Sequence, residues 1–295
     1  MSGRAPAVAR RVAVAFFSAW AAWIVAALTG TARAVEAKAP ASGPVELRFT
    51  VLRAGFEVGS TRWTLEETGS GTYRFRSETR STGLAALLAR GRLLEESVWL
   101  PHAGRPRPLR YRFERIRGKR RRSEVIRFDW VKGVALAARD GQPRSRVALP
   151  SNALDNLTYL LALRRDLSAV LGRFPRDPLA LLPEYLVING GRLKRYRPHL
   201  DLGSPEVRGN DTRTRSGIGS RIEIAGRQVR VFAIERASGP RRTVLWLAPA
   251  LEYWPVRIDH WDRDTRVRLE LNGPASMLSR LALGAHTGGP VAGGR

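Results

Sequence analysis

Apolar and polar side chains alternate with a period of two through most of the chain from Val45 onward. Tyr111 and Phe113, for example, alternate with Arg110 and Arg112. This alternation is typical of β-strands that bury one face and expose the other. Turns that contain glycine separate the alternating stretches at intervals of about ten residues, as in antiparallel sheets and barrels. The sequence therefore predicts a mainly β protein, either a strongly curved antiparallel sheet or an open β-barrel.

One segment, at about residues 152–171, has helical periodicity instead. In SNALDNLTYLLALRRDLSAVLG the leucines recur at the spacing of one helix face. Ser151 can cap the N-terminus of this helix, and Gly172 can end it. We expect one amphipathic helix, packed on the sheet through its leucine-rich side.

The first 34 residues predict a signal peptide. Arginines at the start precede an apolar run from Val12 to Leu28, and Ala32-Arg33-Ala34 supplies the small-x-small pattern that signal peptidase recognises. We expect export to a bacterial periplasm with cleavage after Ala34. The alternative is a retained membrane anchor, because a run of about 17 residues is at the short limit for spanning a bilayer.

The remaining chain is predicted to form a single β-rich domain at residues 45–273, between a flexible linker at 35–44 and a flexible tail at 274–295. The tail is rich in glycine, and the sequence has no internal repeat that would divide the domain. The chain has no cysteine, which excludes disulfides, thiolate catalysis and cysteine-held zinc.

The charge is strongly positive: 51 lysines and arginines face 26 acidic residues, for a formal net charge of +25. A protein this basic attracts anionic surfaces. The densest cluster, residues 105–122, is either a solvated hairpin or a patch for lipid phosphates or an anionic envelope polymer. Nucleic acid is disfavoured as a partner because export removes the protein from it. The arginines predicted to form the anionic patch are Arg110, Arg112, Arg117, Arg120, Arg121 and Arg122.

Two further stretches are candidates for binding a ligand. The leucines of GLAALLARGRLL, residues 83–94, either fold into the core or form an apolar lip beside arginines, which would suit a lipid tail and its head group. VLWLAPALEYWPVRIDHW, residues 244–261, predicts a hairpin whose tryptophans either pack in the core or line a ligand site. The candidate ligand-binding residues are Leu87, Leu88, Arg90, Arg92, Trp246 and Trp254.

Catalytic signatures are absent from the sequence. There is no Gly-x-Ser-x-Gly motif, and the four histidines lack the spacing of a helical metal site. Carboxylates that pair across a sheet cannot be recognised from sequence. We therefore expect no catalytic residues, no metal and no cofactor.

The segments GFEVGSTRWTL, IRFDW, ALDNLTYLLAL and LWLAPALEYWPVRI together resemble the bacterial exported family called domain of unknown function 3108. The resemblance extends from Val45 to Leu271. It implies an antiparallel β protein with a strongly curved sheet or open barrel, and it supplies no catalytic residues.

The sequence thus predicts a non-enzymatic exported envelope protein that binds a hydrophobic or anionic amphipathic, lipid-like ligand in a curved sheet, with only peripheral membrane contact. One alternative is a structural module that docks an acidic envelope partner. The other is an uncharacterised hydrolase.

Overall fold

The computed structural model describes residues 45–83, 86, 91–171, 182–200, 220–238, 241–263 and 265–273. The predicted signal peptide, the linker at 35–44, the tail at 274–295 and the candidates Leu87, Leu88 and Arg90 lie outside these residues. Within the described part of the chain, no helix is both long and apolar enough to span a membrane.

The described residues form β-strands and the helix α2 (Asn156–Leu171). The N-terminal strands are β1 (Val45–Arg53), β2 (Phe56–Gly69), β3 (Thr72–Ser81), β4 (Gly91–His102), β5 (Arg105–Arg117), β6 (Arg120–Asp129), β7 (Val134–Arg139) and β8 (Gln142–Ala148). After α2 follow β9 (Tyr185–Asn189), β10 (Arg192–Tyr196), β11 (His199–Leu200), β12 (Ser220–Ile224), β13 (Arg227–Ser238), β14 (Arg241–Ala248), β15 (Trp254–Asp262) and β16 (Thr265–Leu271).

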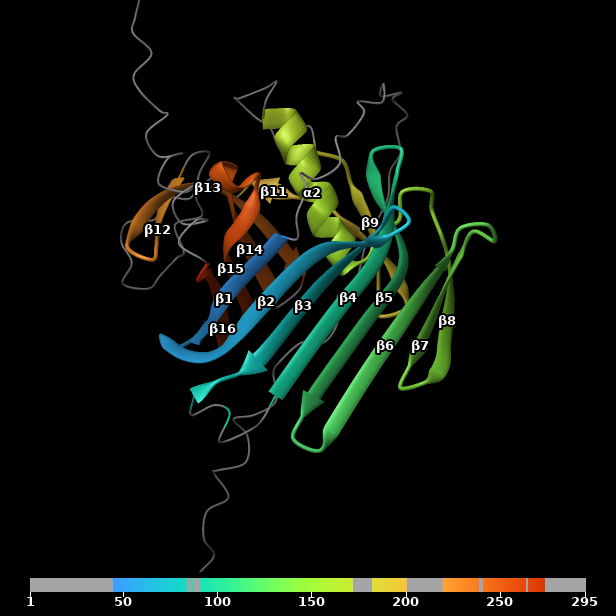
Figure 1. Ribbon diagram of the computed structural model, residues 1–295, viewed down its shortest axis with the longest axis horizontal. Coiled ribbons are helices and arrows are strands. Elements are labelled where there is room, and N and C mark those ends of the chain that lie inside the picture. Colours follow the sequence, from blue (N-terminus) through green and yellow to red (C-terminus); the bar gives the residue numbers. More distant parts are fainter. Residues whose placement is uncertain are drawn as a thin grey trace, which may run out of the picture.

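One large antiparallel sheet dominates the structure (Figure 1). Its strand order is β11-β13-β14-β15-β16-β1-β2-β3-β4-β5-β6-β7-β8, and β12 pairs with β13 beside this path. The two end strands, β11 and β8, do not pair with each other, so the hydrogen-bonded path is open. The predicted mainly β, antiparallel class with one helix is confirmed.

The strand register defines two faces of this sheet. Phe75, Ser97, Tyr111 and Ile126 lie opposite one another across β3 to β6 and therefore share a face. Ser97 of this group hydrogen-bonds to the segment that begins α2, at Asp155. We call this side the inner face and the opposite side the outer face.

Aromatic side chains from distant strands meet on the inner face. The ring centroids of Trp63 and Phe75 are 5.5 Å apart, and the ring of Trp254 lies 6.3 Å from Trp63 and 5.9 Å from Phe75. All three side chains are buried. These contacts join β2 and β3 to β15, although β16 and β1 lie between them in the sheet.

The helix begins later than predicted, at Asn156, and its cap is Asp155 rather than Ser151. Asp155 Oδ1 accepts the backbone N–H groups of Leu157 and Thr158, both at 2.8 Å. Thr158 Oγ1 accepts the Asp155 N–H in return at 2.8 Å, which makes a reciprocal cap. The residue before the cap is held in a ladder with β9, because Leu154 N–H donates to Leu186 O and Leu154 O accepts from Ile188 N–H. That pairing keeps the preceding segment out of the helix.

The hairpin β9–β10 forms a separate sheet that contacts both ends of the large one. Near β8, the Ser145 hydroxyl donates to Gly191 O at 2.8 Å. Near β13, the Arg236 guanidinium lies 4.0 Å from the ring centroid of Tyr196. The hairpin therefore contacts both sides of the opening in the hydrogen-bonded path.

Candidate functional site

The most unusual group in the structure is the buried lysine of β10. Lys194 is 7% exposed. Burial lowers the pKa of Lys194 to about 7, with smaller effects in the same direction from Arg236, Arg192 and Arg241, while Glu124 opposes them. The charges that act on this amine thus come from β10 itself, from β6 and, near the other end of the large sheet, from the adjacent strands β13 and β14.

The charged side chains around Lys194 form what we call the basic cluster: Glu124, Arg139, Lys194, Arg236 and Arg241. Arg139 and Glu124 lie 3.8 Å apart. Arg241 binds the carboxylate of Asp262 at 3.3 Å. Arg236 lies against an aromatic surface, and burial lowers its pKa. The cations of the basic cluster outnumber its carboxylate.

Polar atoms of the basic cluster are buried without complete hydrogen bonding. Glu124 Oε1 and Arg139 Nε have no hydrogen-bond partner among the described residues. Unpartnered buried polar atoms are costly, so they commonly mark sites where water or a ligand binds. A group of cations with a guanidinium fork is suited to an oxyanion such as phosphate or carboxylate.

Partly buried apolar side chains adjoin this basic region on the inner face. Phe113 lies directly opposite Glu124, and Leu93 lies opposite Arg115. Phe113 and Leu93 are both half-buried. Apolar surface and positive charge therefore lie side by side on one wall of the sheet.

The structure divides the arginine patch predicted from residues 105–122 between the two faces. Because side chains alternate along β5 and β6, Arg110, Arg112 and Arg121 lie on the outer face, and Arg117, Arg120 and Arg122 lie on the inner face. On the outer face, Glu114 binds Arg112 at 2.5 Å and Arg121 at 3.1 Å. The inner three extend the positive charge of the face that holds the basic cluster.

The predicted ligand-binding residues that the structure describes, Arg92, Trp246 and Trp254, do not lie together either. Arg92 binds Glu78 at 2.9 Å within the ion pairs of the outer face. Trp246 pairs with Arg257 across β14 and β15, whereas Trp254 contacts the inner-face aromatic rings. The indole of Trp246 thus meets the Asp259 carboxylate, whereas that of Trp254 meets the rings of Trp63 and Phe75.

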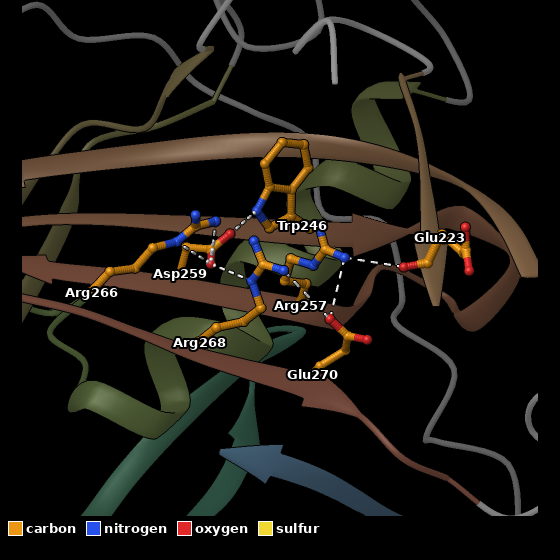
Figure 2. A network of polar contacts seen from close by, with 7 residues as sticks. All are labelled: Glu223, Trp246, Arg257, Asp259, Arg266, Arg268 and Glu270. Atoms are coloured by element: carbon orange, nitrogen blue, oxygen red, sulfur yellow. Dashed lines mark hydrogen bonds and ion pairs between the residues drawn. The ribbon is translucent and has the colours of Figure 1, made fainter. Parts of the chain in front are cut away.

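The outer-face environment of Trp246 is a buried ion network (Figure 2). Asp259 is fully buried and accepts the Trp246 indole N–H at 2.9 Å. Its other oxygen, Oδ1, accepts Nε of Arg266 and Nε of Arg268, both at 3.0 Å. Arg257 donates to Glu223 O at 3.1 Å. This network ties β14, β15 and β16 together, and Asp259 has a structural role in it.

A second buried polar network lies where α2 meets the inner face. The Tyr111 hydroxyl donates to Glu95 Oε1 at 2.5 Å and accepts from Asn156 Nδ2 at 3.1 Å. Asn156 Oδ1 accepts Asn189 Nδ2 at 2.6 Å. The two carboxyls here, Glu95 and Asp155, both have pKa values raised chiefly by burial. Because Asp155 caps the helix and binds Ser97, the arrangement anchors α2 to β4, β5 and β9.

The pKa of Glu95 predicts a pH dependence of stability. Burial raises this pKa above its ordinary value of 4.5, so the folded protein binds the proton more tightly than the unfolded chain does. The stability that this proton contributes is full below the ordinary pKa and is lost as the pH rises through the folded-state pKa. Glu95→Gln keeps an acceptor for Tyr111 and cannot ionise. We expect its free energy of unfolding, relative to wild type, to rise as the pH increases above about 4.5 in urea titrations.

Glu46→Gln is the control with the opposite sign. Hydrogen bonds from Arg48 and Arg62 lower the pKa of Glu46, so its ionised form stabilises the folded state at neutral pH. The Glu46→Gln variant should therefore be less stable than wild type by a difference that is fully present above about pH 4.5 and shrinks as the pH falls below that value. A flat difference for Glu95→Gln would show that Glu95 is not held protonated by the fold.

Neither polar network on the inner face was predicted from the sequence. Lys194 and Tyr196 are two positions apart in RLKRY, so they lie on one face of β10. The sequence does not show which face of β10 is buried. Glu95 and Asp155 are 60 positions apart in the sequence, and they come together only because the start of α2 packs against β4. The sequence signal for this network was the alternation along β4, because Glu95 and Ser97 are two positions apart and therefore point to the same face of the strand.

Comparison with known proteins is informative for the first part of the chain. Residues 46–173 match the model of the family described as "Protein of unknown function (DUF3108)". This confirms the resemblance noted from the sequence for that segment. The DUF3108 segment contains Glu95 and Glu124 and ends before Lys194, and the late motif LWLAPALEYWPVRI lies outside it.

Other comparisons are more distant than the DUF3108 match. A search of curated proteins found no matching sequence. Among solved structures, the chain is similar to the crystal structure titled "Beta-barrel-like Protein of Domain of Unknown Function DUF1849" from Brucella abortus. The two are 10% identical, the alignment covers 77% of this chain and 95% of that chain, and the TM-score is 0.41.

Proposed function

We propose that this protein is a non-enzymatic binding protein of the bacterial envelope that holds an anionic amphipathic, lipid-like molecule on the inner face of an open barrel. The single observation that carries the proposal is the adjacency, on that face, of partly buried apolar side chains and the basic cluster around Lys194. Such a surface matches both ends of an amphipathic anion.

The aromatic contacts support strong curvature of the sheet. Strands in a flat sheet lie about 4.8 Å apart, so β3 and β15, four spacings apart in the strand order, would be separated by about 19 Å. The rings of Phe75 and Trp254 lie only 5.9 Å apart. A sheet that brings them together must curl around its inner face.

The position of the hairpin β9–β10 supports the same conclusion. Lys194 is influenced by Glu124 on β6 and by Arg236 on β13, which stand near opposite ends of the sheet path. In Figure 1, α2 lies between the β13–β15 part and the β4–β5 part of the sheet. We infer an open barrel with the helix and the hairpin on its inside.

Native mass spectrometry tests ligand and compartment together. The full-length gene is expressed in a bacterial host, and the protein is purified from the periplasmic fraction without detergent. We expect a protein mass that begins at residue 35, with a reproducible adduct that solvent extraction identifies as an anionic lipid. A bare mass in the periplasm would favour the structural module that docks an acidic partner. A protein retained in the membrane with its leader would contradict cleavage after Ala34.

A binding titration tests the amphipathic requirement directly. The probe is dansyl-aminoundecanoic acid, whose fluorescence rises in an apolar site, and its methyl ester is the matched neutral compound. We expect the acid to bind at least about tenfold more tightly than the ester, because only the acid has a charge for the basic cluster. Equal affinity for both compounds would contradict an anionic ligand.

A further inference from the structure

We infer that the outer face of β5 to β8 docks on a bilayer that contains anionic phospholipid, through Arg110, Arg127 and Arg146. We call these three residues the arginine row. The inference goes beyond the proposed function, because it concerns the face of the sheet opposite to the ligand. It rests on the strand register, on the distribution of ion pairs over the outer face and on exposed apolar side chains beside the row.

The strand register places the arginine row on one face. Arg110 lies directly opposite Arg127, Arg127 opposite Leu136, and Leu136 opposite Arg146. Residues directly opposite each other share a face, so all four belong to the outer face. Strands lie about 4.8 Å apart, so the row extends over about 14 Å from β5 to β8. Strands β6, β7 and β8 form the right-hand part of the sheet in Figure 1.

The arginine row is exposed, and within the described part of the chain its side chains form no ion pair or hydrogen bond. The nearby acids of β5 and β6 have other partners. Glu114 binds Arg112 and Arg121. Asp129 binds Lys132 at 3.6 Å. Like charges directly opposite each other destabilise a sheet, so the row contributes nothing to folding and leaves its charge for an anion outside the chain.

The outer face of β1 to β3 differs, because its arginines are paired with acids. Arg48 binds Glu46 at 2.7 Å, and Arg62 binds the same carboxylate at 2.5 Å. Arg80 binds Glu78 at 2.7 Å. A general excess of arginine would leave unpaired cations over the whole face. The unpaired cations of the row instead lie at one end of it, which indicates a local docking surface.

Exposed apolar side chains accompany the arginine row. Leu136, between Arg127 and Arg146, is 47% exposed, and Val131, in the turn between β6 and β7, is 99% exposed. Among the described residues, Phe56 is the other large apolar side chain that is exposed. Proteins bind bilayer surfaces by combining cations that attract anionic head groups with apolar side chains that enter the interface. This combination favours a bilayer over a water-soluble polyanion.

The test is flotation of the protein, purified from the periplasm, with vesicles of phosphatidylglycerol and phosphatidylcholine in equal parts. The row variant combines Arg110→Gln, Arg127→Gln and Arg146→Gln. The matched control combines Arg48→Gln, Arg62→Gln and Arg80→Gln, which removes the same charge from exposed arginines that are paired with acids. Circular dichroism confirms that both variants are folded.

We expect the row variant to bind these vesicles at least about thirtyfold more weakly than wild type, because each arginine near an anionic surface contributes roughly a factor of five. The control should stay within about threefold of wild type. Its sites on β1 to β3 are two or more strand spacings from β5, about 10 Å, and salt at about 0.1 M screens charges over that distance. Equal weakening of both variants would show that net charge alone attracts the protein, and would overturn the inference.

Leu136→Gln tests the choice of a bilayer over a soluble partner. We expect it to weaken vesicle binding at least about threefold, because a leucine side chain that enters the interface loses contact with water. Unchanged vesicle affinity would contradict that choice. If wild type binds polyglutamate and leaves the vesicles unbound, the partner is an acidic protein chain and the bilayer assignment is wrong.

Titration with dansyl-aminoundecanoic acid separates this inference from the proposed function. The row variant should bind this probe within about twofold of wild type, because the arginine row lies on the outer face. If wild type floats with the vesicles but does not bind the probe, the docking surface stands and the ligand on the inner face is contradicted. If the row variant loses the probe and the vesicles together, bilayer contact belongs to the inner face and the docking surface is wrong.

Discussion

Replacing Asp259 with alanine is expected to lower the free energy of unfolding by about 3–5 kcal/mol, the range found when one partner of a buried ion pair is removed. Asp259 is fully buried and accepts hydrogen bonds from Trp246, Arg266 and Arg268. Without it, an indole N–H and two guanidinium groups lose their acceptor. Because the side chains of Arg266 and Arg268 are 37% and 23% exposed, they can partly turn to water, which places the expected loss near the lower end of the range.

Urea unfolding followed by circular dichroism measures this loss, and Glu46→Ala is the matched control. Glu46 also binds two arginines, Arg48 at 2.7 Å and Arg62 at 2.5 Å, but its side chain is 32% exposed. Surface pairs of this kind contribute about 1 kcal/mol or less. If the two alanine variants lost equal stability, burial would not be what makes the Asp259 network important.

Replacing Trp254 with alanine is expected to cost about 3–5 kcal/mol, the usual loss for a large aromatic residue in a core. Trp254 is 6% exposed and packs against Trp63 and Phe75. The Arg164 guanidinium of α2 lies 3.6 Å from its ring centroid, and burial lowers the pKa of Arg164 to about 9. Removing the indole therefore opens a cavity and also takes the aromatic face away from a buried cation.

The control variant Trp261→Ala measures what contacts between an indole ring and arginines contribute when the indole is not fully buried. The Trp261 ring lies 5.1 Å from the Arg242 guanidinium and 5.0 Å from that of Arg266, but the residue is only partly buried. We expect Trp261→Ala to cost about 1 kcal/mol, the worth of exposed cation–π contacts. A loss below about 1 kcal/mol for Trp254→Ala would instead place that residue on a ligand site or in solvent.

Sequence patterns predicted much of the secondary structure, because alternation is a local property. The parity of Tyr111 and Phe113 against Arg110 and Arg112 matches the two faces of β5 in the structure. The start of the helix was wrong by several residues. Ser151 is a good capping residue in isolation, but the pairing of Leu154 with β9 keeps the preceding chain extended and leaves capping to Asp155.

The candidate site was harder to predict, since it depends on contacts between distant strands. The arginines of residues 105–122 were treated as one patch, whereas strand alternation sends them to both faces. Trp246 and Trp254 were grouped because they are close in sequence, but Trp246 hydrogen-bonds to Asp259 and Trp254 packs against Trp63 and Phe75. The basic cluster around Lys194 was not recognised, because its members come from five strands and a lysine in a short basic segment resembles any surface lysine.

The sequence alone determined the mainly β class, the existence of the helix and the excess of positive charge. These features follow from periodicity and composition, which are local properties of short sequence segments. Only the tertiary structure decided which cations are buried and what they meet. Charges from β6, β10, β13 and β14 act on one amine, and the energetic cost of burying charge depends on that convergence rather than on any local pattern.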